Sequence, residues 1–420
     1  IELIDWAASQ SWCTGSAGMV GCSYFSLVML LAAIHQPEPL KAIFPYDAWT
    51  DKYRHLYYPG GIPQTGYMWM WFSAMSNLHF SSGRAKNLSG LQEMMQDGLG
   101  FEHPFDGEHY WTVSPQPHVD NINIPTYFGS DWSFYWDHLP GVFAGWEGTN
   151  DIPKRMLVGP KPHPWRPFAA YHQEALRWYD HWLKGRDTGI MDEPPVKLCI
   201  RTSVRECEWR FENEWPLART QYRRYYLNPE AAGVVQDAVH DAILTTTPPS
   251  REGQLVYPTG PEAYSRGLAG QPTLTFVTEP MSEDVEVTGH SNLVMWVSSE
   301  TDDMDIFAYL RNLAPDGTVE TATRGILRVA LRKLDPELST LYRPYHSHDE
   351  EQKLTPGEVV PVQVEIWATS MVFKAGHRIR LDVQPHDGQH YFAAYALGNN
   401  TIYTGGDRAS YVLLPFVPAK

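Results

Sequence analysis

The stretch that most constrains this chain is residues 18–35, which reads GMVGCSYFSLVMLLAAIH. A short apolar run leads to a serine, Ser23, and a continuous helical pattern follows it. This order is typical of a nucleophile elbow, in which a serine stands on a strained turn between a strand and a helix. Gly21 occupies the usual glycine position two residues before the serine, but Phe25 fills the second one. Taken alone, the pattern leaves two alternatives for Ser23, a nucleophile or an ordinary helix N-cap.

Length and composition predict a globular protein of two or three domains. Of the 420 residues, 43% are hydrophobic and 20% are charged. No apolar run reaches the ~18 residues that a membrane-spanning helix needs. The formal charge of −16, from 33 basic and 49 acidic residues, disfavours a nucleic acid or an anionic membrane as the partner. We therefore expect a neutral or cationic substrate.

The four cysteines, Cys13, Cys22, Cys199 and Cys207, are too far apart for a Cys-x-x-Cys metal pair. They are also too few for a disulfide-rich scaffold, so they favour a reducing compartment such as the cytoplasm. The alternative to free thiols is a single disulfide between Cys199 and Cys207. The histidines show no metal-ligand spacing of the His-Glu-x-x-His kind. We therefore expect no metal ion and no cofactor.

The first half of the chain alternates helical and strand patterns, which predicts an α/β domain with a parallel sheet. Residues 1–45 and 124–190 form this predicted domain. Residues 46–123, rich in Tyr, Trp, Met and Gly, interrupt it and are predicted to form an inserted helical cap. From residue 195 to residue 420 short alternating runs are broken by Gly, Pro, Asn and Asp, which predicts an all-β jelly-roll sandwich.

Within the predicted cap, residues 68–72 are apolar on every helical face. Such a segment is either buried on all sides or lines a ligand pocket. Trp69, Trp71 and Phe72 are the candidate substrate-binding residues, and plain core packing is the alternative.

Two loops downstream of Ser23 complete an order typical of α/β-hydrolases. An acid follows one predicted strand and a histidine, His163, follows the next, so the chain runs serine, acid, histidine. A serine hydroxyl becomes nucleophilic when an imidazole takes its proton, and a carboxylate fixes the tautomer of that imidazole. Loops at the carboxyl ends of parallel strands are the usual place for such groups.

Motifs spread over the whole chain resemble one hydrolase family, that of bacterial cocaine esterase, α-amino acid ester hydrolases and X-Pro dipeptidyl-peptidases. Residues 4–12 and 18–24 resemble the signature around its nucleophile, and residues 40–43 resemble its next strand. Residues 177–185 are similar to its Phe-Asp-x-Trp-Leu-Lys-Gly helix. The matching motifs of its C-terminal jelly roll are residues 331–336 and 372–381.

The resemblance implies an α/β-hydrolase sheet with an inserted helical cap and a C-terminal jelly-roll domain. It also implies hydrolysis of an ester or amide, from a small molecule or a short peptide, through an acyl-serine intermediate. Carried over by position, Ser23 matches the nucleophile and His163 the general base. The backbone N–H of Tyr24, which follows the serine, matches one oxyanion-hole donor. Other histidines, His138 among them, are interpreted as surface or core residues.

The triad acid has two candidates. Asp137 follows Tyr135-Trp136 and precedes Gly141 by four residues, which resembles the Trp-x-Asp-x-x-x-Gly loop of the family after a short insertion, and Asp131 is the alternative. The non-catalytic interpretation of Asp137 is a carboxylate that caps its own loop, which is common between a strand and a helix.

The family takes its second oxyanion donor, a tyrosine hydroxyl, from a loop well upstream of the nucleophile. We therefore expect a complementary N-terminal segment, or association of several copies, to complete this chain. Two other functions stay open at this point, a non-catalytic binding or structural protein and an acyltransferase.

Overall fold

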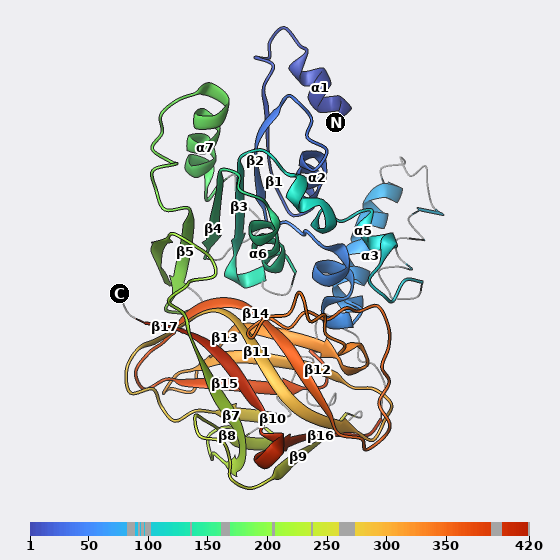
Figure 1. Ribbon diagram of the computed structural model, residues 1–420, viewed down its shortest axis with the longest axis vertical. Helices are drawn as coiled ribbons and strands as arrows, with labels where there is room; N and C mark the ends of the chain where they lie inside the picture. The colour runs from blue at the N-terminus through green and yellow to red at the C-terminus, as the bar shows by residue number, and fades with distance from the viewer. Residues whose placement is uncertain are drawn as a thin grey trace. The chain divides into compact units, whose positions relative to one another are not determined.

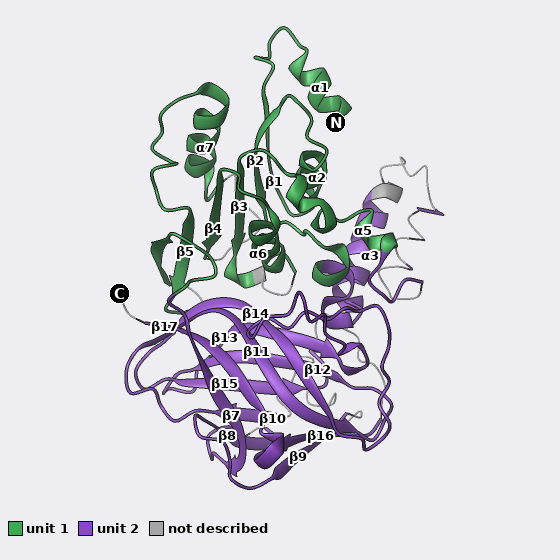
Figure 2. Cartoon of the chain, viewed as in Figure 1, with its two compact units in different colours: residues 1–55, 108–218 green, residues 56–107, 219–420 purple. Residues whose placement is uncertain are grey.

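The computed structural model describes most of the chain (Figure 1). The described ranges are residues 1–81, 89–90, 93, 96, 102–134, 137–160, 169–203, 206–236, 238–259, 274–387 and 397–418. The chain divides into two compact units, one of residues 1–55 and 108–218 and the other of residues 56–107 and 219–420 (Figure 2). Residues 46–123, predicted as one cap, are thus shared between both units, and the predicted domain limits stay predictions.

A mostly parallel sheet forms the centre of the first unit. Its strands are β1 (Ala17–Cys22), β2 (Leu40–Tyr46), β3 (Thr126–Asp131), β4 (Lys154–Gly159), β5 (Val196–Arg201) and β6 (Cys207–Glu212). They pair in this order, and only the last pair, β5 with β6, is antiparallel. β2, β3 and β4 are buried along almost their whole length, as expected for parallel strands with both faces covered. The predicted α/β sheet is confirmed.

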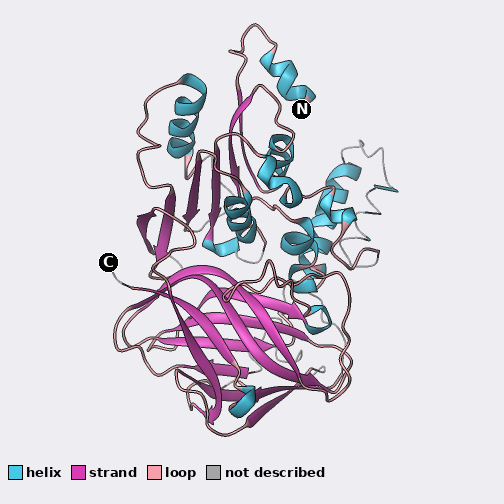
Figure 3. Ribbon diagram, in the orientation of Figure 1, coloured by secondary structure: helices cyan, strands magenta, loops and turns pink. Residues whose placement is uncertain are grey.

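Helices cover both faces of this sheet (Figure 3). They are α2 (Tyr24–Ala33), α6 (Leu139–Gly148) and α7 (His172–Lys184). α1 (Glu2–Ala8) and a short α5 (Glu108–Trp111) belong to the same unit. Neighbouring strand residues point to opposite faces. Tyr127 meets Trp178 of α7, whereas Phe128 lies against Gly145 of α6. α7 ends at Gly185, whose φ of 63° and ψ of 24° give the left-handed C-cap conformation that glycine favours.

The second unit is rich in β-structure and contains one long helix, α3 (Thr65–Ser81). Its strands are β7 (Gln221–Ala231), β8 (His240–Thr245), β9 (Gly253–Pro258), β10 (Leu274–Val277), β11 (Val285–Ser299), β12 (Asp305–Leu313), β13 (Val319–Arg328), β14 (Val360–Phe373), β15 (Arg378–Gln384), β16 (Asn399–Thr404) and β17 (Tyr411–Val417). Their pairings run β7, β8, β10, β15, β12, β13, β14, β11, β17 and back to β7.

This closed circuit explains the alternating sequence pattern of the second half. Side chains that point inward from the strands form one apolar core, which includes Leu293, Ile306, Val364 and Leu381. The β-rich C-terminal region is confirmed, and the jelly-roll topology is taken up below as a proposal. In the described parts of the chain, no helix is long and apolar enough to cross a membrane.

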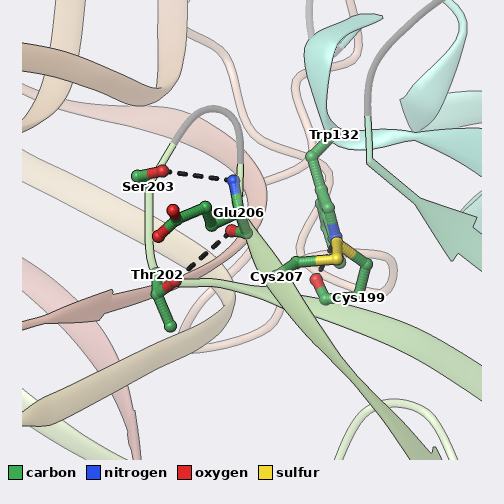
Figure 4. The surroundings of a disulfide bond; sticks show 6 residues. All are labelled: Trp132, Cys199, Thr202, Ser203, Glu206 and Cys207. Atoms are coloured by element: carbon green, nitrogen blue, oxygen red, sulfur yellow. Dashed lines mark hydrogen bonds between the residues drawn. A yellow bond between two sulfur atoms is a disulfide. The ribbon is translucent and has the colours of Figure 1, made fainter.

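A disulfide joins Cys199 of β5 to Cys207 of β6, with their Cα atoms 5.5 Å apart (Figure 4). The turn between these strands is closed by a hydrogen bond from the Glu206 backbone N–H to Ser203 Oγ, 3.1 Å long. Trp132, directly after β3, donates its indole N–H to the Cys199 carbonyl oxygen at 2.7 Å. The Cys199–Cys207 disulfide, one of the two alternatives for these cysteines, is therefore present, and the Trp132 hydrogen bond connects the β5–β6 hairpin to the turn after β3.

We predict that the double variant Cys199→Ser/Cys207→Ser unfolds more readily. The bridge spans a sequence separation of 8 residues, and closing a loop of that size stabilises a protein by about 2–3 kcal/mol. Urea unfolding of the intact chain measures this difference. Cys13→Ser, which leaves the bridge intact, is the control and should keep the wild-type midpoint. Equal midpoints for the double variant and the control would show that the bridge adds nothing.

Candidate active site

Ser23 lies at the turn between β1 and α2, and its backbone is strained. Its φ of 61° and ψ of −122° lie in a region that residues with side chains rarely adopt. The Ser23 N–H donates to the Tyr46 carbonyl oxygen at 2.9 Å, which ties the turn to the end of β2. Ser26 Oγ lies 2.8 Å from the Gly21 carbonyl oxygen and 2.5 Å from that of Tyr46. These bonds hold the strained turn in place.

The two glycine positions around Ser23 have different requirements. A Cβ on Gly21 would lie 2.7 Å from the Cβ of Phe25, so a larger residue does not fit there. Phe25, at the second position, directs its side chain outward and is 70% exposed. The elbow therefore tolerates the departure from the usual pattern at residue 25.

An imidazole and a carboxylate lie beside the Ser23 hydroxyl. His138 Nε2 is 2.9 Å from Ser23 Oγ, which is hydrogen-bond distance. His138 Nδ1 is 3.3 Å from Asp137 Oδ2. Both side chains are buried, and they lie in the loop between β3 and α6, with His138 at the N-cap of that helix. The imidazole is therefore within hydrogen-bond distance of the serine and within ion-pair distance of the carboxylate.

A second buried carboxylate, Asp47, contacts residues at the ends of neighbouring strands behind Ser23. Asp47 follows β2 with φ 52°, and its N–H donates to the Gly129 carbonyl oxygen at 2.7 Å. Ser130 Oγ donates to Asp47 Oδ1 at 2.6 Å, and Cys22 Sγ lies 3.6 Å from Asp47 Oδ2. Asp47 therefore links the carboxyl ends of β1, β2 and β3, where the candidate catalytic groups stand.

Comparison with known proteins covers both halves of the chain. Residues 188–413 match the X-Pro dipeptidyl-peptidase C-terminal non-catalytic domain, and residues 1–165 match the X-Pro dipeptidyl-peptidase (S15) family. The chain belongs to the S15 family. It is a serine hydrolase, and the alternative of a non-catalytic protein is not favoured.

Individual relatives agree with this assignment. A cocaine esterase of a Rhodococcus species is 26% identical, over 99% of this chain and 83% of that protein. A CocE/NonD family hydrolase from Staphylococcus aureus superimposes with a TM-score of 0.84 at 26% identity, covering 99% of this chain and 74% of that one. An α-amino acid ester hydrolase, at 17% identity and a TM-score of 0.74, shares the fold. The S15 chain therefore combines an α/β-hydrolase domain with a β-rich C-terminal domain.

The structure of the S15 chain brings together Ser23 and Asp137, two of the predicted site residues, with His138 between them. His163 lies outside the described residues, so its predicted role stays a prediction. The alternative acid, Asp131, accepts a hydrogen bond from the Ser133 N–H at 2.7 Å and caps its own loop. The structure also places His138, which the sequence predicts to be a surface or core residue, beside Ser23. Its place directly after Asp137, in the loop that follows β3, is the signal that could have identified it.

The predicted substrate-binding residues lie on α3 of the second unit. Phe72 is 1% exposed and belongs to the core, whereas Trp69 is 47% exposed and Trp71 is half-buried. Their role toward a substrate stays a prediction. Within the described ranges, no group of three or more His, Cys, Asp or Glu side chains is arranged to hold a metal ion.

Proposed function

We propose that Ser23 hydrolyses an ester or an amide through an acyl-serine intermediate. The observation that carries this proposal is the 2.9 Å contact between Ser23 Oγ and His138 Nε2 at a strained strand-to-helix turn. Asp137 is the proposed triad acid because its carboxylate adjoins the imidazole that contacts the serine. His138 is the base that the described contacts support. His163 is the second candidate, because its loop follows β4, the strand next to β3.

In the proposed reaction, Ser23 Oγ attacks the carbonyl carbon of the substrate while the histidine takes the hydroxyl proton. The carbonyl oxygen becomes an oxyanion, and the Tyr24 N–H in the first turn of α2 donates to it. The histidine then returns the proton to the leaving alcohol or amine as the bond to it breaks. A water molecule, deprotonated by the same histidine, releases the acid and restores the serine.

We predict that Ser23→Ala abolishes both turnover and labelling by a fluorophosphonate, since the attacking oxygen is removed. Intact-mass measurement of the labelled protein reports the adduct. Ser9→Ala, which removes an exposed hydroxyl that donates to the Trp6 carbonyl oxygen at the end of α1, is the control and should still be labelled. Full labelling of Ser23→Ala would refute the assignment of the nucleophile.

A pair of substitutions, His138→Gln and His163→Gln, identifies the general base. Loss of a catalytic histidine lowers kcat by about a thousandfold or more, because the serine oxygen then keeps its proton. We predict this loss for His138→Gln and a smaller change for His163→Gln, measured as steady-state hydrolysis of a nitrophenyl ester. The reverse ranking would assign the base to His163 and make His138 a neighbour of the serine.

The proposed substrate is a small-molecule ester or a short peptide, cleaved by an acyl esterase or an X-Pro dipeptidyl-peptidase type of activity. The names of the relatives support both classes, since one is a cocaine esterase and others are named as Xaa-Pro dipeptidyl-peptidases. The apolar stretch of residues 68–72 predicts an apolar or aromatic acyl group, and the net charge of −16 is compatible with a cationic amine.

Of the two classes, we predict that esters are preferred. The match to the cocaine esterase covers 83% of that protein, whereas the match to a dipeptidyl-peptidase covers 61%. Short aryl esters should therefore show a higher kcat/KM than Gly-Pro and Ala-Pro anilides in parallel assays. A higher value for the anilides would assign the peptidase activity instead. Added amines or alcohols test acyl transfer, which a new ester or amide product would reveal.

A complementary segment, from the same polypeptide or another one, is proposed to cover the outer surface of the first unit. Large apolar side chains are exposed there on and around α1 and α2, among them Leu3, Trp6, Trp12, Tyr24 and Phe25. An exposed apolar group of this size is typical of a protein contact surface. A second copy of the chain is the alternative occupant.

We also propose the domain limits, the topology of the β-rich part and the cellular location. The domain limits of 1–45 with 124–190, 46–123 and 195–420 rest on changes in sequence pattern. The jelly-roll description of the β-rich part rests on the family resemblance and on its largely antiparallel pairings. A cytoplasmic location also stays a proposal, and the Cys199–Cys207 disulfide argues against it, because such bridges are rare in reducing compartments.

A further inference from the structure

The carboxylate of Asp47 connects the strand that carries the nucleophile to the strand two places along the sheet. Asp47 directly follows β2, and its side chain is buried. Its Oδ1 accepts a hydrogen bond from Ser130 Oγ of β3 at 2.6 Å. Its Oδ2 accepts one from the thiol of Cys22, the residue directly before Ser23, with Sγ 3.6 Å away. One buried side chain therefore contacts the ends of both β1 and β3.

The peptide group between Tyr46 and Asp47 makes the same connection through the backbone. Its carbonyl oxygen, on Tyr46, accepts the Ser23 N–H at 2.9 Å. Its N–H, on Asp47, donates to the Gly129 carbonyl oxygen of β3 at 2.7 Å. A rotation of this single peptide group would break both bonds. Its orientation is therefore coupled to the position of the turn at Ser23.

The backbone conformation of Asp47 requires support from its side chain. Its φ of 52° lies in the left-handed region, which Asp and Asn enter more readily than other residues with a Cβ. A buried carboxylate is also unfavourable unless hydrogen bonds compensate for the loss of water. The bonds from Ser130 and Cys22 supply that compensation and hold the residue in this conformation. The carboxylate thus stabilises the peptide group that binds the Ser23 N–H.

We propose that Asp47 is a positioning residue of the nucleophile. Its carboxylate fixes the last residue of β1, and its peptide group fixes the Ser23 N–H, so that the serine hydroxyl stays at the point from which it attacks. This proposal rests on the proposed role of Ser23 and does not depend on which histidine is the base. Asp47 acts through the turn that it holds, whereas the attack itself is made by Ser23.

The substitutions Asp47→Gly and Asp47→Asn test this role. Glycine adopts a φ of 52° without strain, so Asp47→Gly removes the carboxylate and keeps the backbone conformation. We expect kcat for a nitrophenyl ester to fall about tenfold to a hundredfold with KM unchanged, because a small displacement of the nucleophile slows the chemical step. Asp47→Asn keeps an oxygen that accepts from Ser130, and its kcat should stay within about threefold of the wild-type value.

Cys22 provides an independent test, with Cys13 as the matched control. Cys22→Ser keeps a donor for the Asp47 carboxylate and should retain kcat, whereas Cys22→Ala removes the donor and should lower kcat about threefold to tenfold. Cys13 is the other free cysteine, and its Sγ lies 3.8 Å from the Ser16 carbonyl oxygen. Cys13→Ala should therefore keep the wild-type kcat.

The rate and the extent of fluorophosphonate labelling separate this proposal from the proposed function. Asp47→Gly should be labelled completely but more slowly than the wild type, because Ser23 is still present. Thermal unfolding shows whether each variant folds, and the two Cys22 variants decide the question if Asp47→Gly does not. A wild-type kcat in Asp47→Gly, an equally low kcat in Asp47→Asn, or equal kcat values for Cys22→Ala and Cys13→Ala would each overturn the proposal. Labelling that persists in Ser23→Ala would instead overturn the role of Ser23.

Discussion

The strained backbone of Ser23 is the constraint on which the active site depends. Ser23 keeps its φ of 61° because the surrounding hydrogen bonds hold its backbone in this strained conformation. Its N–H continues the ladder of β1 onto the Tyr46 carbonyl oxygen of β2, and Ser26 one turn later bonds to that same oxygen. Gly21 leaves the room that the turn requires. The result is a hydroxyl that faces an imidazole, with the first turn of α2 directly behind it.

The rest of the site follows from the parallel sheet. The carboxyl ends of β1, β2 and β3 lie side by side, so the segments that leave them meet at one edge. Ser23 follows β1, Asp47 and Trp49 follow β2, and the loop of Asp137 and His138 follows β3. Residues far apart in the sequence thus form one buried polar group. Short-range contacts, such as Ala48 against Gly141, then set the direction of each side chain.

Much of this arrangement could be predicted from the sequence. The buried strands β2, β3 and β4 appear as short apolar runs, and Ser23 stands at a change from strand to helix pattern. The sequence could not reveal the contacts of Trp49 with Asp137 and His138, because they form at a sheet edge made of distant segments. A tryptophan in an aromatic-rich stretch carries no signal that separates a contact with these groups from core packing. The sequence did not decide whether Cys199 and Cys207 form a disulfide for a similar reason, because this pairing depends on the β5–β6 register.

A crystal structure of the phosphonate adduct would show the groups around Ser23 in a state that resembles the tetrahedral intermediate. We expect phosphorus bonded to Ser23 Oγ and a phosphonyl oxygen that accepts a hydrogen bond from the Tyr24 N–H. We also expect Asp137 to keep its hydrogen bond from the Trp49 indole and to face the catalytic imidazole. An adduct on another residue would contradict the account. So would an Asp137 carboxylate that makes no contact with the imidazole beside the phosphonyl group.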